Sequence, residues 1–174
     1  MLPVALDAMG GDHAPLEVVR GAVDAALEGV DVLLVGDEGQ IAPVLERFDA
    51  DLPIVHASEA IEMGEDPSRA VRDKKDASIM VAARLVKSGE AQALVSAGST
   101  GAALAASAFV IGRLHGVSRP AIASIFPTRE VVLDVGANAS CTAGQLYQFA
   151  IMGSIVCADL SGLEAPRVAT LIGS

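Results

Sequence analysis

The stretch from Ala93 to Leu104 constrains the fold more than any other part of this sequence. It begins as a short apolar run that ends at Val95, passes through a small turn containing glycine, and continues as an alanine-rich segment to about Leu114. This order predicts a buried strand, a tight loop and a helix. Such a junction directs several backbone N–H groups toward the positive end of a helix, where phosphate or carboxylate binds.

The loop of this junction is a candidate phosphate site. Ser96, Ser99 and Thr100 can add hydroxyl donors to the backbone N–H groups, and Gly98 and Gly101 allow the backbone to approach an anion closely. The residues alone leave a second interpretation open. In that interpretation the segment is an ordinary strand-to-helix turn that needs glycine only for close packing.

The same pattern occurs at the start of the chain. Leu2–Leu6 is an apolar run, Asp7–His13 is a loop with adjacent glycines at Gly10 and Gly11, and an apolar helical stripe leads from Pro15 to Leu27. The loop is a candidate wall of a ligand site, with Asp7 and Asp12 as candidate catalytic carboxylates. The alternative is a structural Gly-Gly turn in which Asp12 caps the helix.

Apolar runs and helical stripes alternate along the rest of the sequence. This order predicts a single α/β domain with three layers, in which helices cover both faces of a mainly parallel sheet. Only 3% of the residues are aromatic, so the core must consist of Ala, Val, Leu and Ile. Strands are expected at 31–36, 53–57, 121–126, 131–135 and 168–172, and helices at 37–48 (where Pro43 argues against a regular helix), 77–87 and 145–160.

Three loops follow predicted strands and carry polar residues: Asp7–His13, Ser96–Gly101 and Asp134–Asn138. Because the carboxyl ends of parallel strands share one edge of the sheet, we expect these loops to lie together, where open α/β sheets bind ligands. Asp134 and Asn138 are therefore further catalytic candidates, able to orient a substrate or the loops.

A basic cluster interrupts an otherwise acidic chain of net charge −10. One explanation is an anionic ligand held by charged hydrogen bonds. The other is a solvated surface helix on which acids and bases offset one another. The cluster consists of Arg69, Arg72, Lys74 and Lys75.

Composition and missing motifs exclude several classes. The acidity argues against a nucleic-acid partner. The sequence has no P-loop and no G-x-G-x-x-G motif, and its three histidines and two cysteines lack metal-ligand spacing, so we expect neither a P-loop nucleotide site, nor a standard dinucleotide site, nor a metal. We expect no signal peptide and no transmembrane helix, and a reducing cytoplasm is the simplest setting for two unpaired cysteines.

These motifs together resemble a known family from one end of the chain to the other. The sequence is similar to the bacterial phosphate acyltransferases of phospholipid synthesis (acyl-[acyl-carrier-protein]:phosphate acyltransferases). The matching segments are 5–12 (ALDAMGGD) with Ala14-Pro15, 56–59 (HASE), 63–68 (MGEDPS), 70–76 (AVRDKKD), 95–98 (VSAG) with 100–102 (TGA), 119–122 (RPAI), 133–138 (LDVGAN), 148–150 (QFA) with 152–154 (MGS), and 166–168 (PRV).

The resemblance implies a three-layer fold of the phosphotransacetylase-like or isocitrate dehydrogenase-like kind and a homodimer. It implies transfer of a fatty acyl group from acyl carrier protein to inorganic phosphate without a cofactor. The acyl phosphate would pass to a membrane-bound glycerol-phosphate acyltransferase, and the protein would be cytoplasmic, with peripheral membrane association. An alternative is a truncated, inactive phosphate-binding or regulatory module of the same family.

The sequence also departs from the family pattern. Ser99 stands where Asn is usual, Ala77 where Ser is usual and Ser140 where Asp is usual, and the connection from Pro127 to Val131 is short. Family members are roughly twice as long, so the resemblance makes this chain their N-terminal half. We therefore expect little acyltransferase activity from the 174 residues alone.

Overall fold

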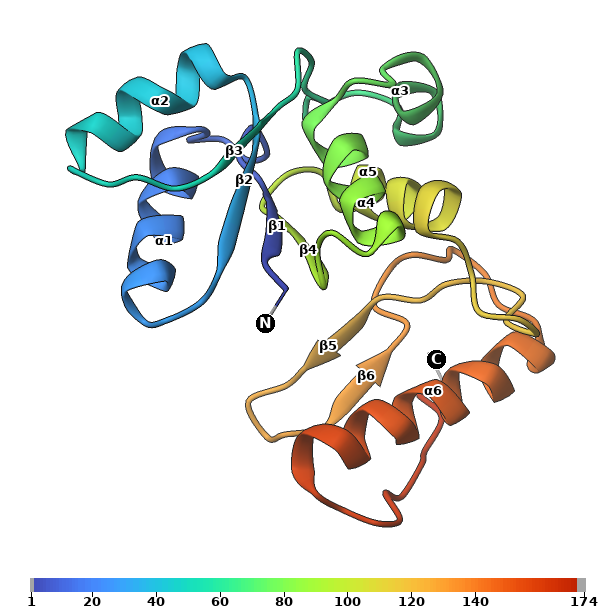
Figure 1. Cartoon of the computed structure of the whole chain (residues 1–174). Helices are drawn as coiled ribbons and strands as arrows, with labels where there is room; N and C mark the ends of the chain where they lie inside the picture. Colours follow the sequence, from blue (N-terminus) through green and yellow to red (C-terminus); the bar gives the residue numbers. More distant parts are fainter. Residues whose placement is uncertain (1, 172–174) are drawn as a thin grey trace. The chain divides into compact units, whose positions relative to one another are not determined.

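The computed structural model describes residues 2–171, and a four-stranded parallel sheet positions the candidate site (Figure 1). The strands are β1 (Val4–Asp7), β2 (Val32–Gly36), β3 (Ile54–His56) and β4 (Ala93–Ser96), in the order β3-β2-β1-β4. β1 pairs with β4 so that Asp7 lies beside Ser96. Two loops that the sequence singled out therefore leave the sheet from neighbouring strands at the same edge.

Helices cover both faces of this sheet, which confirms the predicted three-layer α/β/α fold. α1 (Leu16–Leu27) and α2 (Glu38–Arg47) lie on one face, and α4 (Ser78–Ser88) lies on the other (Figure 1). The alternation of side chains along each strand explains the two layers. In β2, Leu34 packs in the cluster beneath α1 and α2, whereas the adjacent Val35 packs against α4.

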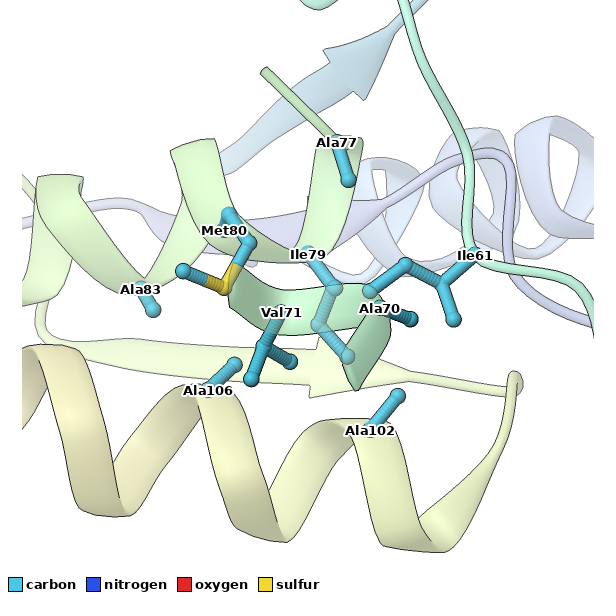
Figure 2. Close-up of a cluster of buried hydrophobic side chains, with 9 residues drawn as sticks. All are labelled: Ile61, Ala70, Val71, Ala77, Ile79, Met80, Ala83, Ala102 and Ala106. Carbon is cyan, nitrogen blue, oxygen red and sulfur yellow. The ribbon is translucent and has the colours of Figure 1, made fainter. Parts of the chain in front are cut away.

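A second layer of packing holds the helix that follows the β4 loop. α3 (Pro67–Asp73), α4 and α5 (Thr100–Ala106) enclose a cluster of small and aliphatic side chains, which Figure 2 shows. α5 continues as one π-helical turn, η1 (Ser107–Ile111), and ends at Gly112, whose φ of 101° suits only glycine. The predicted helix therefore ends before Leu114.

The helix α2 corrects one expectation, because it runs without interruption through Pro43. Pro43 removes the N–H that would bond to Gly39 in the first turns, and Gly39 is exposed, so its carbonyl can bond to water. Asp37 offsets the loss as N-cap, since its side chain accepts hydrogen bonds from Gly39 N and Gln40 Nε2.

The described chain forms two compact units, one ending at Gly112 and the other beginning at Arg113. The second unit contains β5 (Ala123–Ile125), β6 (Val131–Leu133) and α6 (Ala143–Ser161). β5 and β6 form a separate antiparallel hairpin, so the expectation that the Asp134–Asn138 loop follows a strand of the main parallel sheet is wrong. The connection between them is too short for a parallel crossover, which needs a dozen or more residues. That both units belong to one domain stays a prediction.

Two further features of the second unit differ in how well the sequence predicted them. The expected helix at 145–160 is confirmed, and a capping box between Thr142 and Gln145 fixes its start. The expected strand at 168–172 is wrong in its described part, because residues 168–171 have no partner strand; Ile172 lies outside the described residues.

Candidate functional site

A buried carboxylate lies at the centre of the site. Asp7, at the end of β1, is only 3% exposed. It accepts hydrogen bonds from Ser78 Oγ at 2.6 Å and Ser96 Oγ at 2.7 Å, and a longer one from Met9 N at 3.3 Å. These bonds join β1, the first turn of α4 and the end of β4. Sequence reasoning missed Ser78, because nothing in the chain order connects it to Asp7.

The Ser96 hydroxyl is fully used within this network. Its one proton goes to Asp7, and its oxygen accepts a hydrogen bond from Gly98 N at 3.0 Å. A hydroxyl has a single proton to donate, so in this arrangement Ser96 cannot also donate to an anion. Ser96 and the Gly98 N–H therefore shape the loop, and any part they take in phosphate binding stays a prediction.

The two glycine loops touch at Gly10 and Gly98. A Cβ added at Gly10 would lie 2.6 Å from Asp7 Oδ2 and 2.9 Å from Gly98 N, and one added at Gly98 would lie 3.1 Å from Gly10 Cα. Gly11 has a φ of 110°, which glycine alone adopts readily. Glycine is thus required for close packing here, as the structural interpretation of both loops proposed. That requirement does not exclude an anion at the same edge.

The start of α5 provides backbone N–H donors that take no part in the hydrogen-bond network of Asp7. Ser99 is the N-cap, and its Oγ accepts from Ala102 N at 3.4 Å. Within residues 2–171, the N–H groups of Thr100 and Gly101 have no hydrogen-bond acceptor, as expected in a first helical turn. The Thr100 side chain is exposed. Pro67 of α3 packs so closely on Gly101 that an added Cβ would lie 2.6 Å from its Cγ.

Most of the basic cluster already has partners within the protein. Lys74 Nζ forms an ion pair with Glu65 at 2.6 Å and donates to the Ala60 carbonyl, and the hydrogen bond from Lys74 holds the pKa of Glu65 below its usual range. Lys75 donates to the carbonyl of Val71. The remaining members differ: Arg69 pairs with Asp73, whereas Arg72 is exposed and has no polar partner within the part of the chain that the structure describes.

Asp134 and Asn138 form a network of their own in the second unit. Asp134 accepts hydrogen bonds from the backbone of Ile122, Ala137 and Asn138 and from the Asn138 side chain. Partial burial would raise the pKa of Asp134, but these bonds together hold it below its usual value. The structure thus brings Asp134 and Asn138 to each other, in a different sheet from Asp7 and Ser96.

A cavity of about 680 Å³ adjoins the loops of the first unit. Its walls come from α1, β1 and β4, and the Gly10–Gly11 turn closes one end. Asp12 and His13 lie at its rim; Asp12 does not cap α1, because Pro15 occupies the N-cap position. The volume is within the range of small-molecule sites.

Residues 2–171 lack two further features. No group of three or more His, Cys, Asp or Glu side chains is arranged to hold a metal ion. None of the described helices is both long enough and apolar enough to cross a bilayer.

A parallel α/β/α sheet with two loops meeting at its carboxyl edge is an open-sheet α/β architecture, in which ligands usually bind at that edge. Residues 2–174 match the model of the family described as "Fatty acid synthesis protein", and the chain belongs to that family. It is 52% identical over 174 residues to the phosphate acyltransferase of Desulforamulus reducens and 56% identical over 176 residues to that of Heliobacterium modesticaldum. Each alignment covers 97% of this chain and 52% of the relative, so the chain spans about half the length of these relatives.

Proposed function

We propose that this chain carries the phosphate-binding part of an acyltransferase that moves a fatty acyl group from acyl carrier protein to inorganic phosphate. The observation that carries the proposal is the meeting of the Gly10 and Gly98 loops at the carboxyl edge of β1 and β4, beside the free N–H groups of Thr100 and Gly101. The names of the similar proteins, phosphate acyltransferase, supply the reaction class.

In the proposed reaction, the main task of the protein is to position the phosphate and the thioester. Phosphate is anionic near neutral pH, so one of its oxygens can attack the thioester carbonyl without a strong base. The new bond joins the carbonyl carbon to phosphate oxygen, and the carbon–sulfur bond breaks to release the carrier thiol. N–H donors that face the carbonyl oxygen would stabilise the charge that develops there. The free N–H groups at the start of α5 are proposed to bind the phosphate. Arg72 of α3, which is exposed and has no polar partner among the described residues, would add a positive charge.

Asp7 is proposed as a positioning residue rather than as a base. Both of its oxygens already accept hydrogen bonds from side chains, and its side chain is buried beneath the loops. Asp12, which is exposed at the cavity rim, keeps its place as a catalytic candidate, and the Asp134–Asn138 network is proposed to orient its own loop.

A second candidate is a phosphate-binding or regulatory module that does not turn over. The specific observation in its favour is the second unit, where many large apolar side chains are exposed in α6 and in the β5–β6 hairpin. An acyltransferase that needs those faces covered would not work as this chain alone. Transfer of the acyl group from coenzyme A instead of acyl carrier protein is a third, weaker possibility.

The wider setting of the activity is part of the same proposal. The product, an acyl phosphate, would serve phospholipid synthesis through a membrane-bound glycerol-phosphate acyltransferase. The protein would act in the cytoplasm as a homodimer, with peripheral association at the membrane.

An assay with three substrates separates these candidates. The chain is incubated with phosphate and either acyl carrier protein thioester or acyl-coenzyme A, and acyl phosphate is trapped with hydroxylamine. The proposal expects saturable phosphate binding by the chain, weakened in Thr100→Pro, which removes the Thr100 N–H at a helix position that tolerates proline. It expects phosphate-dependent product from the carrier protein thioester when the other half of a full-length relative is added in trans. Saturable phosphate binding without any product even with that half present, while the full-length relative is active in parallel, would favour the module instead.

A further inference from the structure

The cavity beside α1 has an unusual combination of walls. Its floor is Leu6 of β1 and Val95 of β4, which are register partners and therefore point to the same face of the sheet. One wall is a stripe of small residues on α1, formed by Gly21, Ala22 and Ala25. Val95 remains 49% exposed, because α1 covers β1 and β2 but leaves this face of β4 open. The result is an open groove with a mainly apolar lining, called the channel below.

The two ends of this channel differ in chemistry. One end is formed by Gly10–Gly11 and Ser96–Ala97, where an added Cβ at Gly11 would lie 3.2 Å from the carbonyl oxygen of Ala97. The far end, near Ala25 and Val30, is apolar. From Glu17 to Ala25 the helical rise gives the part of the channel along α1 a length of about 12 Å. Polar backbone at one end and an apolar lining along the remainder suit a molecule with a reactive head and a long hydrocarbon tail.

Charges at the rim indicate which head group fits. Asp12 and Glu17 line the head end, and Glu17 pairs only loosely with Arg20, at 3.9 Å. Two carboxylates there disfavour a free fatty acid, whose head is negatively charged, and tolerate an uncharged thioester. His13, also at the rim, is exposed.

From these features we propose that the channel between α1 and β4 binds the fatty acyl chain of the thioester, with the carbonyl held at the Gly10–Gly11 turn. This inference rests on the proposed function and adds the location of the acyl chain, the preference for an uncharged head and the residues that set chain length. Ala25 and Val30 mark the far end, so enlarging Ala25 shortens the chain that fits.

Gly21 offers a direct test, because a Cβ there would meet no atom within 4 Å. Gly21→Leu fills the middle of the channel and improves helix propensity, so the fold is kept while the space is lost. Gly144→Leu in α6 is the matched control, since Gly144 is also a helical glycine with no neighbouring atom. Binding of the butanoyl and dodecanoyl thioesters of N-acetylcysteamine, and of dodecanoate, is measured by calorimetry on the full chain.

The wild-type chain is expected to bind the dodecanoyl thioester more than tenfold tighter than the butanoyl thioester, since each buried methylene strengthens binding up to about fourfold. It should also prefer the thioester to dodecanoate. Gly21→Leu should abolish the chain-length preference, Ala25→Leu should move it to shorter chains, and Gly144→Leu should leave it unchanged. An equal preference in wild type and Gly21→Leu would overturn the proposal.

Two further outcomes separate this inference from others. Weak binding of every thioester, together with a wild-type dimer that Gly21→Leu converts to monomer, would make the channel an interface between copies and overturn the proposal. Phosphate binding is titrated in the same samples. Its loss in Thr100→Pro, which lacks the Thr100 N–H, with an unchanged chain-length preference bears on the phosphate site alone and supports a separate acyl channel.

Discussion

The two units of this chain bury their apolar residues to very different extents. Among the described residues, Phe149 is the only buried apolar side chain after Gly112, whereas the unit before Gly112 has three buried clusters around its sheet. α6 is apolar on most sides, yet Tyr147, Ile151 and Ile155 are exposed. A helix with this composition is normally enclosed. The first unit therefore has a buried core of its own, whereas the described residues of the second bury one large apolar side chain.

The same contrast applies to the polar networks. In the first unit, the buried Asp7 joins segments distant in sequence, reaching Ser78 and Ser96. In the second unit, Asp134 bonds to neighbours within one loop and to Ile122. The first network depends on tertiary packing and supports it, whereas the second mainly fixes a turn. The structural effect of a substitution should therefore extend to more distant segments in the first unit than in the second.

The largest effect is expected from Asp7→Ala. It leaves the Ser78 and Ser96 hydroxyls without their buried acceptor, at a cost of about 3 kcal/mol to the unfolding free energy of the first unit. Urea unfolding is followed by far-UV circular dichroism and by fluorescence of Tyr147, the only tyrosine in a chain without tryptophan. The circular dichroism midpoint should fall while the Tyr147 signal stays the same. Equal shifts of both unfolding midpoints would show that the two units unfold together, which would contradict the contrast drawn between them.

A smaller effect is expected from Gly98→Val. Its side chain would press on Gly10 Cα and Ser96 Oγ, which lie 3.1 and 3.2 Å from the added Cβ, and such overpacking costs about 1–3 kcal/mol. Phosphate affinity should fall as the two loops separate. Gly64→Val is the control, because a Cβ added at Gly64 would have no neighbouring atom within 4 Å. Wild-type stability and phosphate binding in Gly98→Val would mean that the contact between the loops is dispensable.

Acid should loosen the second unit locally at Asp134. Its folded pKa lies below the ordinary value of 3.8, so its contribution to stability is fully present above that value and is lost as the pH falls through the lower folded pKa. Hydrogen exchange at the Ala137 and Asn138 amides should then accelerate beyond the intrinsic pH dependence, measured against Asp134→Asn. Protection that does not depend on pH in this range would contradict the role given to the carboxylate.

The smallest effect is expected in the basic cluster. Lys74→Ala removes the ion pair with Glu65 and should cost about 0.5–1 kcal/mol, because the pair is partly exposed. Lys75→Ala should cost less, since the exposed Lys75, in the turn after α3, donates only to the carbonyl of Val71 near the end of that helix. Thermal melts of both variants, with phosphate titrations alongside, give the comparison. A larger loss of phosphate affinity in Lys74→Ala than in Arg72→Ala would indicate that Lys74, despite its ion pair, takes part in phosphate binding.

The fold of the first unit was largely predictable from the sequence, because each strand is an apolar run and each helix has an apolar stripe. The pairing of Asp7 with Ser78 was not, since it depends on how α4 packs on the sheet. The antiparallel β5–β6 hairpin was within reach, because its connection is short. The predicted strand at 168–172 is absent from its described part, residues 168–171, because an apolar run forms a strand only when a partner strand is available.

The candidate site was predicted less completely than the fold. Glycine positions pointed to the meeting of two loops, which the structure confirms at Gly10 and Gly98. The sequence could not show that Ser96 donates its proton to Asp7, or that Lys74 is already paired. Hydrogen-bond partners of such side chains depend on the distances between loops, and residue types do not encode those distances directly.

The central claim is that phosphate binds in the first unit, at the start of α5, and not at the Asp134–Asn138 loop. The most direct measurement is a phosphate titration of the isotope-labelled chain followed by amide NMR, with sodium chloride added to match ionic strength. Saturable shifts are expected at Ser99, Thr100 and Gly101 and none at Ala137 or Asn138. Shifts confined to the Asp134–Asn138 loop, or no saturable shift at Thr100 and Gly101, would contradict it.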